Sequence, residues 1–171
     1  MKKIWLGTLS AMLFVLSAQA ADFKWMDDQG KIYNLAESYK NQPIVVHFWA
    51  SWCPPCVAEM PEMVAWLKEH PQVKLLPVSL DNSLEKVQSF LQKNQINLPA
   101  LLTDNSQSGR MGVRGLPTTI LIDQHGKVLA ARIGMQDWQQ HTWTDQLLAL
   151  FSSESIQKTV PIKEIARTEH H

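Results

Sequence analysis

The sequence predicts one α/β domain in which parallel strands are connected by helices and a hairpin adds an antiparallel pair. Two observations support this fold class: apolar runs alternate with amphipathic stretches, and a tight turn separates the last two apolar runs. The 171 residues are 45% hydrophobic and 19% charged, which suits a domain with a buried core and excludes a disordered chain. Because the formal net charge is zero and no basic cluster is present, we expect no nucleic acid partner.

The central part of this domain is the best defined. Residues 43–49 form a continuous apolar run rich in β-branched and aromatic residues, which predicts a central strand buried on both faces. The prolines after Cys53 open a helix. Helical spacing predicts that its buried face consists of Val57, Met60, Val64 and Leu67.

The later elements follow in an alternating order. We expect a strand at 73–80, a helix begun by a capping box of Asn82 and Glu85, and a short extended piece at 99–102. A helical turn at 106–111 and a hairpin of strands 118–123 and 128–133 come next. Asp137 is expected to cap a last helix over residues 138–151.

The N-terminal segment carries a targeting signal. Lys2 and Lys3 precede an uncharged apolar stretch and the small-residue site Ala18-Gln19-Ala20, which indicates a secretory signal peptide over residues 1–20. An uncleaved membrane anchor is the alternative, because the charge-free run approaches the length of a membrane span. We therefore expect a periplasmic location, a folded domain over 21–151 and a polar tail over 152–171.

The chain has two cysteines, Cys53 and Cys56. They are too few for a disulfide scaffold or an ordinary zinc site, and a bond between them closes too short a loop to stabilise the fold much. At a helix N-terminus, unpaired N–H groups and the helix dipole stabilise a thiolate, which makes Cys53 the expected nucleophile. Cys56, one turn later, is placed to attack a mixed disulfide on Cys53 and release the product.

Three motifs in order resemble a known family: the run FWASWCPPC at 48–56, Glu59-Met60-Pro61, and GLPTT at 115–119 before Ile122-Asp123. Together they resemble thioredoxin-fold proteins of the TlpA/ResA class, over about residues 32–151. The resemblance implies a thioredoxin-like fold with a central mixed β-sheet flanked by helices, and a TlpA-type βαβ insertion at 81–104. It also implies an exported protein thiol-disulfide oxidoreductase with a CPPC active site.

Activity and partners follow from the same resemblance. Members of this class are usually disulfide reductases of exported client proteins with cysteine pairs, apocytochromes c in cytochrome c biogenesis among them. They are recharged by a membrane dithiol donor of the DsbD/CcdA kind. We expect a monomer that needs no cofactor or metal ion beyond its own redox-active disulfide.

The resemblance also implies which residues form the active site. Cys53 corresponds to the exposed nucleophile, Cys56 to the resolving thiol and Pro117 to a proline that follows a cis peptide bond. Such a bond would turn the backbone of Leu116 toward the cysteines, where it could hydrogen-bond an extended client segment. Trp52 would provide a flat apolar platform beside them. The expected substrate-binding residues are Trp52, Pro54, Pro55 and Leu116.

His47 departs from the family pattern, because thioredoxins have a buried acid here and many TlpA-like proteins an asparagine. An imidazole exchanges protons near neutral pH, so His47 is a candidate proton carrier for Cys56. A hydrogen-bonded core histidine without catalytic duty is the alternative. Glu59 and Glu62 are expected on a solvated helix face, and Thr118 and Thr119 as ordinary strand residues.

Two other functions compete with disulfide exchange. The main alternative is a Cu(I)-binding protein of metallochaperone type, in which the two thiolates and a histidine would hold the ion. A redox-inert interaction module is the third. The CxxC spacing at a helix start favours exchange, because that reaction requires this arrangement.

Overall fold

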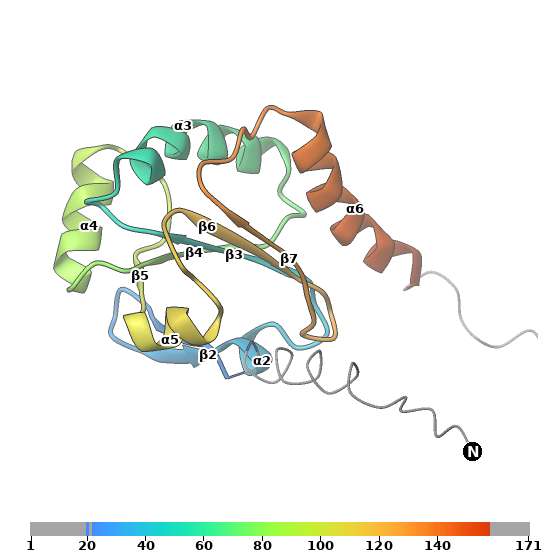
Figure 1. The fold of residues 1–171 in the computed structure, drawn as a ribbon, viewed down its shortest axis with the longest axis horizontal. Helices are drawn as coiled ribbons and strands as arrows, with labels where there is room; N and C mark the ends of the chain where they lie inside the picture. The colour runs from blue at the N-terminus through green and yellow to red at the C-terminus, as the bar shows by residue number, and fades with distance from the viewer. Residues whose placement is uncertain (1–19, 21, 158–171) are drawn as a thin grey trace, which may run out of the picture.

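The structure is a computed structural model that describes residue 20 and residues 22–157, and these form a seven-stranded sheet with helices on both faces (Figure 1). Apart from residue 20, the expected signal peptide lies outside the described residues, as does the chain from 158 onward. The strands are β1 (Lys24–Met26), β2 (Ile32–Asn34), β3 (Ile44–Trp49), β4 (Leu75–Ser79), β5 (Leu101–Leu102), β6 (Thr118–Ile122) and β7 (Val128–Ile133). The helices are α2 (Leu35–Ser38), α3 (Pro54–Glu69), α4 (Leu84–Lys93), α5 (Asn105–Arg110) and α6 (His141–Gln157).

The sheet is mixed, as the sequence predicts. Its strand order is β2-β1-β5-β4-β3-β6-β7. β3 pairs in parallel with β4 and antiparallel with β6, and β4 connects through α4 to the parallel strand β5. β6 and β7 form the expected antiparallel hairpin. The βαβ unit expected over residues 81–104 is therefore present as α4 and β5 beside β4.

Two apolar cores lie on opposite faces of the sheet, with β3 between them. Val45 and Trp49 belong to the core shared with α3, α4 and α6, whereas Val46 and Phe48 belong to the core shared with α2. Figure 1 shows α3 and α6 over one face and α2 and α5 over the other. Every residue of β3 is buried, which confirms the prediction of a central strand enclosed on both faces.

The buried face of α3 is shifted by one position from the predicted one and shares Met60 with it. Its buried residues are Cys56, Glu59, Met60, Met63 and Trp66. Val57, Val64 and Leu67 are half-buried at the edge of this face. The prediction was wrong because helical spacing alone fits either row, and burying the large Met63 and Trp66 side chains removes more apolar area from water.

Several helix ends also differ from the prediction. Ser83, not Asn82, caps α4, because its Oγ accepts a hydrogen bond from the Lys86 N–H at 3.4 Å. Asp137 caps a turn rather than α6, since its carboxylate accepts from the Gln139 N–H at 3.0 Å. α6 then begins at His141 and continues beyond the expected end at 151. No periodic pattern predicts β1, β2 or α2, which are only three or four residues long.

A buried carboxylate anchors the loop between β3 and α3. Asp81, 5% exposed, lies just after β4. Its Oδ2 accepts hydrogen bonds from the Ser51 N–H at 2.9 Å and the Ser79 hydroxyl at 2.7 Å, and its Oδ1 accepts from the Ser51 hydroxyl at 2.7 Å. Because Ser51 directly precedes the Trp52-Cys53 pair, this carboxylate holds the segment that presents Cys53.

We predict that Asp81→Ala lowers the free energy of unfolding by about 2–3 kcal/mol, because donors of half-buried Ser51 and buried Ser79 lose their acceptor. Urea denaturation of the oxidised protein, followed by tryptophan fluorescence, measures this change. Asp28→Ala is the matched control, since Asp28 is exposed in the turn between β1 and β2, and it should change stability by less than about 0.5 kcal/mol. Equal effects of the two substitutions would contradict the anchoring role of Asp81.

Candidate active site

A disulfide joins Cys53 and Cys56 at the N-terminus of α3. Cys53 is the N-cap residue, and Pro54 and Pro55 occupy the first helical positions, where a missing N–H costs no hydrogen bond. Cys56 is fully buried and Cys53 is 5% exposed. Cys53 is thus less exposed than the family resemblance implies, because its sulfur is bonded to that of buried Cys56. Only Cys53 offers any surface to an approaching molecule.

The peptide bond between Leu116 and Pro117 is cis, as the resemblance implies. Pro117 leads into β6, whose first residue, Thr118, pairs with Phe48 at the end of β3. The cis bond therefore lies at the edge of the sheet from which the chain continues to Cys53. Among the described residues, the backbone N–H and C=O of Leu116 have no hydrogen-bond partner.

Exposed apolar side chains surround this edge of the sheet. Trp52 is 65% exposed, Pro54 and Pro55 are also exposed, and Leu116 is half-buried. The sequence analysis missed two further members, Ile133 and Met135, which are 61% and 57% exposed. Ile133 pairs with Thr118, and the Gly134 N–H donates to the Pro117 carbonyl at 2.8 Å, which places this segment beside the cis bond. No periodic signal marks it, because its position depends on pairing with β6.

His47 lies in β3 on the same sheet face as Val45 and Trp49, toward α3. Its side chain is completely buried, and its Nδ1 is hydrogen-bonded to the Thr119 hydroxyl at 3.0 Å. Its Nε2 faces Oε1 of Glu59 at 3.1 Å, close enough for an ion pair. These two atoms are not aligned for a hydrogen bond, and neither has another partner among the described residues.

Glu59 is the site residue that the sequence analysis placed wrongly. It is 2% exposed rather than solvated, whereas Glu62 is exposed as expected. Its Oε1 faces His47, and its Oε2 accepts a hydrogen bond from the Gln136 N–H at 2.7 Å. A buried carboxylate needs such partners, and they come from β3 and from the segment after β7, which spacing within α3 does not reveal. Glu59 follows Cys56 by one helical turn on the same buried face.

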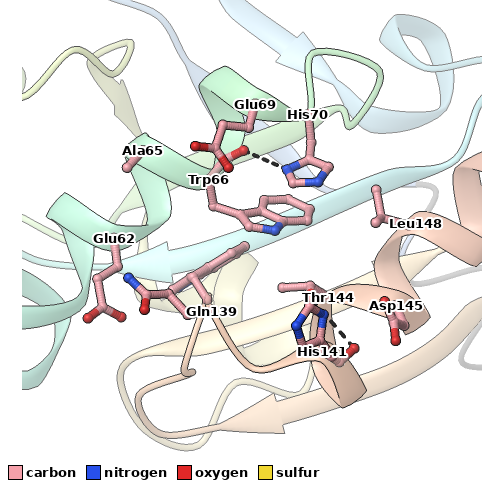
Figure 2. Close-up of a pocket in the computed structure, with 11 residues that line it drawn as sticks. Glu62, Ala65, Trp66, Glu69, His70, Gln139, His141, Thr144, Asp145 and Leu148 are labelled. Atoms are coloured by element: carbon pink, nitrogen blue, oxygen red, sulfur yellow. Dashed lines mark hydrogen bonds between the residues drawn. The ribbon is translucent and has the colours of Figure 1, made fainter.

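A separate hollow of about 480 Å³ lies between α3 and α6 and does not include either cysteine. Figure 2 shows Trp66 and His70 on one side of it and His141 and Thr144 on the other. The His70 ring stacks on Trp66 at 4.2 Å between centroids, and its Nδ1 is hydrogen-bonded to the Trp66 carbonyl at 2.8 Å. Disulfide exchange at Cys53 does not require this hollow.

The copper alternative is not favoured by this geometry. Within residue 20 and residues 22–157, no three His, Cys, Asp or Glu side chains are grouped so that they could hold a metal ion. His47, the histidine nearest the cysteines in sequence, directs its two ring nitrogens toward Thr119 and Glu59.

The described helices include none with the length and hydropathy that a membrane span requires.

Comparisons with known proteins indicate the family of this chain. The model of the AhpC/TSA family matches residues 16–131. The chain is 32% identical over 114 residues to sporulation thiol-disulfide oxidoreductase A of Bacillus subtilis, covering 63% of this chain and 69% of that protein. It is 30% identical over 132 residues to the thiol-disulfide oxidoreductase ResA of Geobacillus thermodenitrificans, covering 74% and 75%.

A solved structure gives the same result for the fold. The exposed lipoprotein thioredoxin Etrx1 of Streptococcus pneumoniae superposes with a TM-score of 0.61 at 30% identity, covering 74% of this chain and 98% of that one. This confirms the thioredoxin-like fold. The chain therefore belongs to the AhpC/TSA family of thioredoxin-fold proteins, as a thiol-disulfide oxidoreductase of the ResA type with the cysteine pair Cys53 and Cys56.

Proposed function

We propose that this oxidoreductase is exported and reduces disulfides in client proteins outside the cytoplasmic membrane. The observation that carries the proposal is the Cys53–Cys56 disulfide at the start of α3, at the same sheet edge as the cis bond of Pro117 and the unpaired backbone of Leu116. A purely structural disulfide would need neither of these neighbours. Cys53 acts as the nucleophile and Cys56 as the resolving thiol.

The reaction has two exchange steps. The Cys53 thiolate attacks one sulfur of the client disulfide, which forms a mixed disulfide and releases the other client sulfur as a thiolate. The Cys56 thiolate then attacks the Cys53 sulfur, which forms the internal disulfide and releases the second client sulfur. Two electrons pass from the dithiol to the client, whose thiolates take up two protons. A membrane dithiol donor of the DsbD/CcdA kind reduces the internal disulfide again.

The second step needs a proton acceptor, because Cys56 is fully buried and reacts only as a thiolate. Glu59 lies one helical turn from Cys56 and faces His47, so the two form a pair that takes the proton as Cys56 attacks. This proposal assigns His47 a role as proton carrier with Glu59, rather than that of a core histidine alone.

The client binds to the apolar residues around the disulfide. Trp52, Pro54 and Pro55 lie on the cysteine side, and the unpaired backbone of Leu116 adds to an extended client segment as a strand would. Ile133 and Met135 extend this surface on the side of β7. Backbone hydrogen bonds and apolar contacts suit clients that share a cysteine pair but differ in sequence, apocytochromes c included.

Two observations support the proposed export. The charged start, apolar stretch and small-residue site of residues 1–20 are typical of a cleaved signal peptide, and a relative with 30% identity is described as an exposed lipoprotein. We place the mature protein in the periplasm as a monomer, with a folded domain from residue 21. The membrane donor would keep the dithiol reduced there, as a reductase requires.

Trapping tests the assigned roles of the two cysteines. We expect Cys56→Ser to accumulate a mixed disulfide with a peptide that contains one intramolecular disulfide, because the resolving thiol is missing. Cys53→Ser, the matched control, should form no such adduct, since the remaining thiol is buried. Mass spectrometry after acid quenching measures both products. Equal trapping by the two variants would mean that the assignment of nucleophile is wrong.

The equilibrium reduction potential tests the direction. We expect a value toward about −270 mV, the thioredoxin end of the known range, because a reductant must hold its electrons weakly. Titration of the mature protein against dithiothreitol or glutathione, followed by tryptophan fluorescence, gives the value. A potential near about −120 mV would instead identify a disulfide donor and overturn the proposed direction.

A further inference from the structure

We propose that Thr119 is a positioning residue for His47: its hydroxyl holds the buried imidazole in both of its protonation states, so that Nε2 stays directed at Glu59. This inference rests on the proposed function, in which the His47–Glu59 pair takes the proton of Cys56. It assigns a role to a residue whose position in a strand predicts only packing.

The backbone brings the two side chains together. His47 and Thr119 are directly opposed in the antiparallel pairing of β3 with β6, and opposed residues place their side chains on the same sheet face. Neither side chain is exposed, and Nδ1 of His47 lies 3.0 Å from Oγ1 of Thr119. The contact is therefore fixed by strand register, and water does not compete for it.

A hydroxyl is suited to this position because it both donates and accepts hydrogen bonds. When His47 is neutral, the Thr119 hydroxyl donates to Nδ1, and the ring proton is carried by Nε2, which lies 3.1 Å from Oε1 of Glu59. When His47 is protonated, Nδ1–H donates to the same hydroxyl. The hydroxyl rotates between these states, and the described residues offer it no competing partner. Thr118 differs, since its hydroxyl donates to the Gly115 carbonyl at 2.7 Å.

Other groups surround the His47 ring besides Thr119. From α3, Glu59 faces Nε2, and Cys56 precedes it by one turn in its disulfide. From β4, the register neighbour is Pro77, which does not ionise. The segment before α6 contributes the edge of the Trp138 ring, with centroids 6.3 Å apart, and the Gln136 N–H that binds Glu59.

The remaining nearby ionisable groups surround the hollow of Figure 2, whose lining includes neither His47 nor Glu59. These groups are Glu62, Glu69, His70, His141 and Asp145. The two ring nitrogens of His47 have one ionisable and one neutral neighbour among the described side chains, Glu59 at Nε2 and Thr119 at Nδ1.

The test compares Thr119→Val, which removes the hydroxyl at nearly constant volume, with Thr119→Ser, which keeps it. The rate at which the reduced protein reduces a disulfide-containing peptide is measured from pH 5 to pH 9. We expect Thr119→Val to slow the reaction about tenfold at its optimum and to shift the pH profile toward that of His47→Asn. Thr119→Ser should restore the profile and keep the rate within about threefold of the unsubstituted protein.

Thr144→Val is the matched control, because it also removes a buried threonine hydroxyl in the same core but one that donates to the Gln140 carbonyl. It should leave the pH profile unchanged. An unchanged profile in Thr119→Val, or a failure of Thr119→Ser to restore it, would overturn the inference. Absence of exchange by the unsubstituted protein would overturn the proposed function instead, and an unchanged profile in His47→Asn would overturn the role of the histidine.

A measurement on the unsubstituted protein keeps the inference testable if Thr119→Val does not fold. Nitrogen-15 NMR of the histidine side chains identifies which ring nitrogen of His47 carries the proton. When the ring is neutral, we expect the proton on Nε2 and a bare Nδ1 that accepts from Thr119. A neutral ring with its proton on Nδ1 would show that the hydroxyl does not hold the ring in the proposed way.

Discussion

The enclosure of β3 is the constraint on which the rest of the structure depends. This strand is paired on both edges and covered on both faces, so each of its side chains belongs to a defined core. A slip of one residue would send His47 to the other face and bring Phe48 toward α3, which the two apolar cores do not permit. The point where the chain leaves the sheet is therefore fixed, and with it the position of Cys53. Asp81 adds the last restraint by holding Ser51.

The buried pair of His47 and Glu59 connects this framework to the chemistry. A carboxylate inside a core is costly unless it is paired, so α3 must orient Glu59 toward partners that the sheet supplies. This requirement agrees with the buried face that α3 actually has, in which Glu59 lies between Cys56 and Met63. In the proposed exchange, the rotation of α3 that turns Glu59 toward these partners also buries Cys56, three residues earlier, on the same face. The packing of α3 and the proposed proton transfer therefore favour the same rotation of this helix about its axis.

Local sequence patterns predicted the parts of the fold that local interactions decide. The apolar run of β3, the proline-opened helix after Cys53 and the hairpin of β6 and β7 all appear where expected. The helix caps were predicted wrongly although their partners are local, because neighbouring polar residues compete for the same position. The error at the site concerns a residue whose partner is distant in sequence, since Gln136 is 77 residues from Glu59. The helical position of Glu59 is compatible with a solvated face, and only the packing of β3 and the segment after β7 against α3 shows that it is buried.

In the proposed reaction, the geometry around Cys53 restricts which proteins can reach the cysteine pair. Cys53 is 5% exposed in the disulfide form, so a sulfur of a partner protein approaches it along a narrow direction. In the proposed binding, the exposed side chains of Trp52 and Met135 release water when an apolar segment covers them, and the unpaired backbone of Leu116 orients that segment. Neither contribution depends on a particular client sequence. In the proposed reaction, selectivity therefore comes from an extended segment that carries a reachable disulfide, and the buried groups beneath act only after that segment has bound.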